Sequence, residues 1–170
     1  MATATLIPVE EYLRSSSSPD REYVEGVVLE RNLGEIPHSY LQKLLCNLFD
    51  ARGVQGFAEV RTQVKPSRFR VPDVLAVREM PKTRFLRTPP NIVVEILSPE
   101  DRVAALAGKI RDYLDFDIPN IWVVDPAWKT ISNWTRDGSR VFTAAAVTAD
   151  GSVSIPLDEI FSRMPEFESE

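Results

Sequence analysis

The stretch that decides the fold runs from Arg70 to Tyr113 and reads RVPDVLAVREMPKTRFLRTPPNIVVEILSPEDRVAALAGKIRDY. Two short segments within it predict β-strands, VPDVLAV at 71–77 and VVEILSPE at 93–100. Both are rich in β-branched residues and are bounded by prolines or charged residues. Neither alternates apolar with polar residues, which indicates strands that are covered on both faces.

Each predicted strand carries one carboxylate, Asp73 in the first and Glu95 in the second. A buried carboxylate is costly unless it is paired or coordinates a metal. Two of them on neighbouring strands therefore predict a shared cation, and hard divalent ions such as Mg²⁺ prefer oxygen ligands of this kind. Two alternatives stay open at this point: Asp73 faces solvent, or Glu95 pairs with a structural Arg or Lys.

The residues that follow predict a helix that carries Lys109 and Tyr113. Ser98-Pro99-Glu100-Asp101 is typical of a helix start, with a capping serine, a proline and an acid in the first turn. The expected buried face consists of the apolar residues at helical spacing, Val103, Leu106, Ala107, Ile110 and Leu114. Lys109 and Tyr113 lie one turn apart on its flank, from where a lysine stem can reach the strand ends. The alternatives are an exposed helix lysine and a tyrosine that only fills the core.

The order of these features resembles the PD-(D/E)XK nuclease superfamily: an acid after Pro72, an acid on the next strand, and then a lysine. VPDVLAV, VVEILSPE, K-x-x-x-Y at 109–113 and IWVVDP at 121–126 resemble more closely the bacterial Uma-type family, whose members are classed as restriction endonucleases. The resemblance extends over roughly residues 8–163. It implies that Asp73 and Glu95 hold Mg²⁺ or Mn²⁺ and that Lys109 is the catalytic lysine.

The chain departs from the superfamily pattern at two positions. Leu97 stands two residues after Glu95, where the superfamily has a lysine. In the Uma-type pattern the lysine has moved to the following helix, which matches Lys109. Ala105 stands one turn before Lys109, where many such sequences carry an aspartate.

Two further residues are candidates for the edge of the site. Glu22, near the start of an expected strand at 22–30 in which Gly26 marks a turn or bulge, is a candidate for an additional acidic ligand, and Glu25 is its rival. His38 is the single histidine and opens an expected helix at 38–52. A locally hydrogen-bonded imidazole is one interpretation. The resemblance favours a place beside the site, because Uma-type sequences often have a histidine at this helix start.

The net charge of −5 is unevenly distributed. Between residues 61 and 87 there are eight basic and two acidic residues, so this segment carries +6 and the remainder −11. The basic residues that precede Asp73 are candidates for contact with a phosphate backbone. They are Arg61, Lys65, Arg68 and Arg70. A solvated strand-and-loop face is the alternative.

Composition excludes several other kinds of site. One histidine and one cysteine cannot build a two-histidine zinc site or a thiolate site within one chain, and no phosphate-binding glycine loop is present. No apolar run approaches the roughly 20 residues that span a bilayer, and the N-terminus lacks the pattern of a signal peptide. We therefore expect a cytoplasmic protein with no membrane partner, and the single Cys46 is consistent with a reducing compartment.

Further elements are expected outside the central stretch. They are a short helix at 8–14, an alternating strand at 57–65, an apolar strand at 120–125, a hairpin of strands at 129–134 and 140–147 around Asp137-Gly138, and a short helix within IPLDEIF at 155–161. Residues 1–170 are expected to form one α/β domain. We expect it to have a restriction-endonuclease-like core, a mixed β-sheet flanked by helices, and a C-terminal β-hairpin.

The expected function is hydrolysis of DNA phosphodiester bonds by an endonuclease that uses Mg²⁺ or Mn²⁺. A homodimer is expected because two-fold symmetry suits the cutting of both strands of a duplex. The alternative is a catalytically idle relative that has kept the fold in order to bind nucleic acid or a protein partner.

Overall fold

The computed structural model describes residues 6–17, 19–31, 35–98 and 103–166. Its central element is a six-stranded mixed sheet with the strand order β10-β9-β8-β7-β6-β3. The strands are β3 (Gln55–Ala58), β6 (Val74–Val77), β7 (Ile92–Ile96), β8 (Ile121–Asp125), β9 (Thr130–Thr135) and β10 (Gly138–Val141). Only the β7–β8 pair is parallel among these neighbours. The expected mixed α/β architecture is confirmed.

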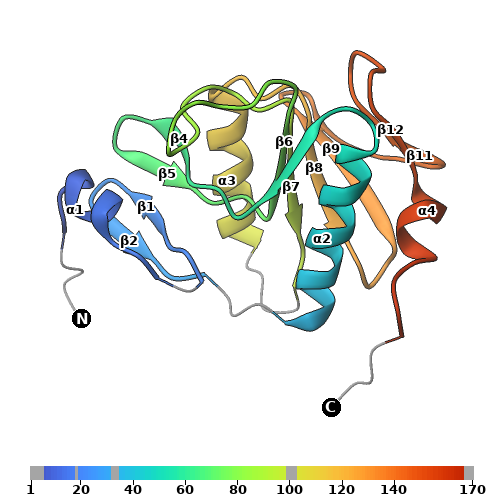
Figure 1. The fold of residues 1–170 in the computed structure, drawn as a ribbon, viewed down its shortest axis with the longest axis horizontal. Helices are drawn as coiled ribbons and strands as arrows, with labels where there is room; N and C mark the ends of the chain where they lie inside the picture. The colour runs from blue at the N-terminus through green and yellow to red at the C-terminus, as the bar shows by residue number, and fades with distance from the viewer. Residues whose placement is uncertain (1–5, 18, 32–34, 99–102, 167–170) are drawn as a thin grey trace.

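Helices cover both faces of the central strands, and Figure 1 shows α2 (Ile36–Asp50) and α3 (Val103–Asp115) on either side of β6 and β7. Side chains of α2 pack with one set of strand residues, which includes Val74, Val94 and Trp122. Side chains of α3 pack with the alternate set, which includes Leu75, Val93 and Val123. Every residue of β6 and β7 is buried. The apolar runs are therefore continuous because both faces of these strands are covered, as the sequence indicates.

The parallel pairing of β7 with β8 determines where α3 lies. Parallel neighbours need a crossover, because a tight turn cannot bring the chain back to the same end of the sheet. Here α3 makes that crossover and lies on the face of the sheet that carries Val93. Glu95 is two residues further along β7, so its side chain points to the same face, towards α3.

A second sheet of four strands, in the order β2-β1-β5-β4, lies beside the first. Its strands are β1 (Glu22–Val24), β2 (Val27–Leu29), β4 (Thr62–Lys65) and β5 (Arg68–Arg70). Helix α1 (Val9–Arg14) is attached to it through Tyr12, whose ring stacks on Tyr23 at 5.0 Å and lies 5.5 Å from Phe69. Gln63 N donates to the Leu86 carbonyl at 2.8 Å, at the point where a parallel bridge also pairs Thr62 with Leu86.

The C-terminal part completes the α2 side of the core. The hairpin of β9 and β10 is present as expected, and Gly138, with φ of 125°, begins β10. Strands β11 (Ala145–Val147) and β12 (Ser154–Pro156) form a separate pair that precedes α4 (Leu157–Phe161). Ile155 and Ile160 place this unit in the same cluster as α2. Within the described residues, no helix combines the length and the apolar character that crossing a membrane requires.

Three predicted strands are each divided in the structure. The expected strand at 140–147 becomes β10, which ends at Val141 and pairs with β9, and β11, which begins at Ala145 and pairs with β12. The expected strand at 22–30 is a hairpin of β1 and β2, because Glu25 and Gly26 adopt φ of 50° and 90° and form its tight turn. The turn lies at Gly26, where the sequence indicated a turn or bulge. The expected strand at 57–65 ends at Ala58, where Glu59 takes a left-handed φ of 56°, and β4 then begins in the other sheet. A left-handed residue redirects an extended chain, so alternation alone overestimated the length of this strand.

The buried face of α3 differs from the predicted one. Val103 is 85% exposed and Ala107 is also exposed, whereas Asp112 and Tyr113 are buried. Asp112 is buried in ion pairs with Arg68 and Arg70 of β5, which apolar spacing alone does not predict. The predicted helix start at Pro99 to Asp101 lies outside the described residues. The other predicted elements are present, with α2 beginning at Ile36 rather than at His38.

The packing of β3 on α2 yields a stability prediction. A Cβ added at Gly56 would lie 2.6 Å from Cys46 Cα and 2.9 Å from its carbonyl oxygen. Backbone atoms of a packed helix cannot move aside easily, so Gly56→Ala should destabilise the protein by about 1–3 kcal/mol in urea unfolding. The matched control is Gly108→Ala in α3, where the nearest atom to the new methyl is 3.8 Å away. This change should stabilise by up to about 1 kcal/mol through helix propensity. Equal effects of the two substitutions would contradict the close approach.

Candidate active site

The two predicted acids meet at one edge of the central sheet. Asp73 immediately precedes β6 and Glu95 lies in β7, and these strands pair antiparallel with Val74 opposite Val94. One step further along, Asp73 and Glu95 lie opposite each other. The backbone N–H of Ile96 donates to Asp73 Oδ2 at 2.7 Å, and both acids are about 5% exposed or less. The two acids are therefore buried side by side, Asp73 just before β6 and Glu95 within the adjacent β7; their convergence on one ion stays a prediction.

Helix α3 brings Lys109 and Tyr113 to Glu95. Lys109 Nζ lies 2.9 Å from Glu95 Oε2, and the Tyr113 hydroxyl donates to Glu95 Oε1 at 2.6 Å. The two side chains reach the same carboxylate because they are one turn apart on one helix. Lys109 is therefore not an exposed helix lysine, and the fully buried Tyr113 has a polar role besides filling the core.

Glu22 approaches Lys109 from β1. Its Oε1 lies 3.5 Å from Lys109 Nζ and accepts a hydrogen bond from Val71 N at 3.1 Å. Its rival Glu25 lies in the hairpin turn, with its side chain 53% exposed, and pairs with Arg68 and Ser67. Of the two alternatives, the structure brings Glu22 to the site.

Asp73 has a different set of cations. Arg31 Nη2 donates to Asp73 Oδ1 at 2.9 Å, and His38 Nε2 lies 3.3 Å from the same oxygen. His38 is in the first turn of α2, so it borders the site as the resemblance implied. The sequence did not single out Arg31, which lies just after β2. A lone arginine after a hairpin matches no motif, and it meets Asp73 only because the fold joins positions 42 residues apart.

Two of the four basic residues expected to contact nucleic acid are buried in ion pairs, so the prediction for them is wrong. Arg70 is 8% exposed and holds both Glu22, at 2.8 Å, and Asp112, at 2.7 Å. Arg61 is 6% exposed, pairs with Asp20 at 2.6 Å, and lies 4.4 Å from the centre of the Tyr12 ring. Their guanidinium groups neutralise internal acids and present no free face to a phosphate.

The other two, Lys65 and Arg68, remain partly exposed but also have acidic partners. Lys65 lies 3.1 Å from Asp115, and Arg68 lies 2.7 Å from Asp112. These pairs attach the β4–β5 hairpin to α3. Contact of these two residues with DNA stays a prediction. We did not predict a role for Asp112 from the sequence. Its place as a charged residue between Lys109 and Tyr113, on the same helix, was a signal that could have identified it.

The two acids titrate in opposite directions from their ordinary values. Burial raises the pKa of Glu95 to about 7; the charge of Lys109 opposes this shift, and the Asp73 and Glu22 carboxylates add to it. Burial also acts to raise the pKa of Asp73, but the hydrogen bonds from His38 and Ile96 and the charges of His38 and Lys109 lower it overall. Neighbouring carboxyls whose pKa values are pushed apart are typical of acid–base sites.

The donor set is compatible with a hard divalent ion. Within the described part of the chain, no three His, Cys, Asp or Glu side chains converge on a common point. Mg²⁺ is commonly bound by one or two carboxylates and keeps several waters, so two carboxylates are as many protein ligands as it commonly takes. Burial is the main cause of the raised pKa of Glu95, and the Asp73 and Glu22 carboxylates add to it. A shared cation would offset this repulsion.

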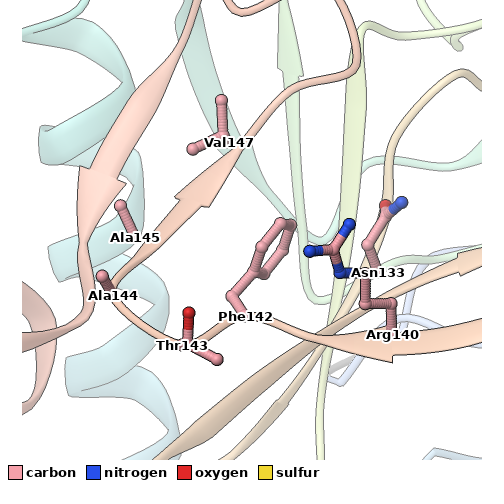
Figure 2. Close-up of a pocket in the computed structure, with 7 residues that line it drawn as sticks. All are labelled: Asn133, Arg140, Phe142, Thr143, Ala144, Ala145 and Val147. Carbon is pink, nitrogen blue, oxygen red and sulfur yellow. The ribbon is translucent and has the colours of Figure 1, made fainter.

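Two surface pockets lie away from these acids. The larger, of about 450 Å³, is drawn in Figure 2. It is lined by Asn133, Arg140, Phe142, Thr143, Ala144, Ala145 and Val147. The smaller, of about 100 Å³, includes Arg78 and Asn91, which lie at the opposite ends of β6 and β7 from the acids. No predicted site residue lines either pocket, so size of cavity does not identify the site here.

Comparison with known proteins gives the family and the fold of the chain. A family model, Uma2, described as "Putative restriction endonuclease", matches residues 9–162. No curated protein matches the chain. A solved structure from Anabaena variabilis, described as a putative nuclease belonging to DUF820, superposes with a TM-score of 0.79 at 20% identity. The superposition covers 92% of this chain and 98% of that one. The restriction-endonuclease-like fold that the sequence predicts is therefore confirmed.

A second solved structure, the DrdV–DNA complex, superposes with a TM-score of 0.43 at 14% identity. It covers 77% of this chain and 11% of that one. The conclusion about the fold rests on the first superposition and on the family model.

The raised pKa of Glu95 yields a prediction for stability against pH. Between its ordinary value of 4.5 and about 7, the folded protein holds this proton while the unfolded chain has lost it. The free energy of unfolding should therefore fall as pH rises through this window. Glu95→Gln cannot titrate, so between about pH 5 and pH 8 its free energy of unfolding should fall by roughly 2–3 kcal/mol less than that of the wild type. Urea unfolding of metal-free protein measures the difference. Glu159→Gln, outside the site, should follow the wild type, and an unchanged pH dependence in Glu95→Gln would refute the shift.

Proposed function

Because the chain belongs to the Uma2 family of putative restriction endonucleases, we propose that it is a metal-dependent endonuclease that hydrolyses DNA phosphodiester bonds. The observation that carries the proposal is the pair of buried carboxylates, Asp73 and Glu95, with Lys109 Nζ 2.9 Å from the second. The proposal includes action in the cytoplasm. It also includes a two-fold dimer, since two related sites suit the two strands of a duplex.

Asp73, Glu95 and the backbone carbonyl of Ile96 would hold Mg²⁺ or Mn²⁺. When bound, such an ion acidifies a water and neutralises charge on a phosphate oxygen. The other residues act around this position. His38 and the Ile96 N–H hold the two oxygens of Asp73, and Tyr113 holds the Glu95 oxygen that Lys109 does not contact.

Lys109 is the group proposed to act on the reacting phosphate. Its ammonium is held between Glu95 and Glu22, and burial works against its charge while these acids raise its pKa, so it stays protonated. A fixed positive charge in a site of low dielectric can orient the attacking water and stabilise the charge that develops on the phosphate. The chemical product would be a hydrolysed phosphodiester.

A second candidate function is binding without catalysis. The contacts of the acids favour it in one respect, because Arg31, His38, Lys109 and Tyr113 satisfy Asp73 and Glu95 with no further ion. An idle protein needs only this internal pairing, whereas a nuclease of the proposed kind needs the acids to bind metal. Metal binding therefore separates the two candidates.

The first test is thermal stability with and without metal. A ligand of the native state stabilises by about 2.7 kcal/mol at 100 times its Kd, which for a chain of this size raises Tm by roughly 5–10 °C. Mn²⁺ or Mg²⁺ should produce this shift in the wild type, and Asp73→Ala should abolish it. The control Glu159→Ala removes a carboxylate that pairs with Arg52 outside the site and should keep the shift. The same response in Asp73→Ala as in the wild type would exclude Asp73 as a ligand.

The second test separates catalysis from metal binding at Lys109. Loss of one preorganised charge typically costs about 10²- to 10³-fold in rate. Lys109→Ala should therefore lower single-turnover DNA cleavage at saturating Mn²⁺ by this factor while the Mn²⁺-dependent Tm shift stays nearly intact. Lys109→Arg should restore little, because a planar fork replaces a compact charge.

The control for this test is Lys43→Ala, which removes an exposed lysine from α2. It should cleave at the wild-type rate. If Lys109→Ala also cleaves at that rate, Lys109 has no part in the reaction.

A further inference from the structure

Arg31 contacts Asp73, the carboxylate that the proposed function assigns to a metal ion. Its Nη2 donates to Asp73 Oδ1 at 2.9 Å, and its Nη1 lies 3.3 Å from Glu59 Oε1. The side chain is about 10% exposed, so this is a largely buried ion pair rather than a solvated contact. A guanidinium and a divalent ion cannot both approach one carboxylate oxygen closely, because like charges repel strongly away from water.

Glu59, the second acid that Arg31 approaches, is held in place by backbone and side-chain contacts. Glu59 has a left-handed φ of 56°, an uncommon conformation for a residue with a side chain, and its backbone N–H donates to the Asp73 carbonyl at 3.3 Å. The Gln42 amide bridges Glu59 Oε1 and the Asp73 carbonyl, at 3.3 and 3.1 Å. These contacts set two carboxylates, Asp73 and Glu59, on either side of one arginine.

Arg31 is nevertheless held less firmly than Lys109. Its Nη1 is buried and makes no hydrogen bond of acceptable geometry, although it is near Glu59. It also shares Asp73 Oδ1 with His38. Lys109, in contrast, extends from the middle of α3 and contacts Glu95 and Glu22. When a divalent ion enters, Arg31 is therefore the cation that leaves.

We propose that Arg31 is an internal competitor for the metal position at Asp73, and that on displacement by metal it binds a phosphate of the substrate strand. This inference rests on the proposed function. Once the ion has neutralised the acids, the arginine at the edge of the site has lost its carboxylate partner. A phosphate offers the bidentate acceptor geometry that a guanidinium prefers.

The test measures Mn²⁺ affinity by calorimetry for the wild type, Arg31→Met and Arg31→Lys. If the state with Arg31 displaced is populated at about 10% or less, Arg31→Met should bind Mn²⁺ about tenfold or more tightly than the wild type. Arg31→Lys keeps a cation and should stay near the wild type. The matched control Arg52→Met removes a part-buried arginine paired with Glu159 and should leave the affinity unchanged. Melting curves without metal establish that each variant is folded.

The second readout is DNA affinity by fluorescence anisotropy at saturating Mn²⁺, with Lys109→Ala present in every variant to keep the DNA uncut. Adding Arg31→Met should weaken DNA binding, although metal binding is tighter. Mn²⁺ affinity in Arg31→Met equal to that of the wild type would overturn the competition. Unchanged DNA affinity would overturn the phosphate contact. Failure of the proposed function looks different, because the wild type itself would then bind no Mn²⁺.

Discussion

The burial of two opposed carboxylates in the central strands is the constraint on which the rest of the structure depends. Asp73 just before β6 and Glu95 in β7 are both buried where helices cover the sheet on both faces, so neither acid can be satisfied by bulk water. Uncompensated buried charge is strongly destabilising, and each surrounding element supplies part of the compensation. The crossover helix α3 brings Lys109, the first turn of α2 brings His38, and the segment after β2 brings Arg31.

A second layer of ion pairs connects this site to the smaller sheet. Glu22 contacts Lys109 and is held by Arg70; Arg70 also holds Asp112, which is in turn shared with Arg68. The arginines that form a basic run in the sequence are thus, in the fold, the partners of acids on β1 and α3. The charge of a segment does not reveal whether its cations face solvent or neutralise internal acids. Only the three-dimensional pairing distinguishes the two.

Much of the fold and the centre of the site followed from local patterns in the sequence. Continuous apolar runs predicted β6 and β7, helical spacing placed Lys109 and Tyr113 on one flank, and a carboxylate in each run marked the adjacent acids. Patterns failed where a single backbone angle or a long-range contact decides the outcome. The left-handed backbone of Glu59 divides one predicted strand, and Arg31 contacts Asp73 although 42 positions separate them in the chain. No periodicity encodes either event.

The cations that already pair with the two acids also change how much free energy a metal ion would gain by binding there. In a site of bare carboxylates, an ion would relieve repulsion and gain the full Coulombic attraction. Here the carboxylates already have cationic partners, so an ion gains only the difference between its own interactions and those it replaces. The fold can therefore keep two buried acids without metal, and an ion bound as we propose would gain less than it would from two bare carboxylates. The same surroundings explain how the pKa values diverge within one site. Burial acts to raise the pKa of both acids, but at Asp73 the hydrogen bonds from His38 and Ile96 and the charges of His38 and Lys109 lower it overall, whereas at Glu95 burial prevails.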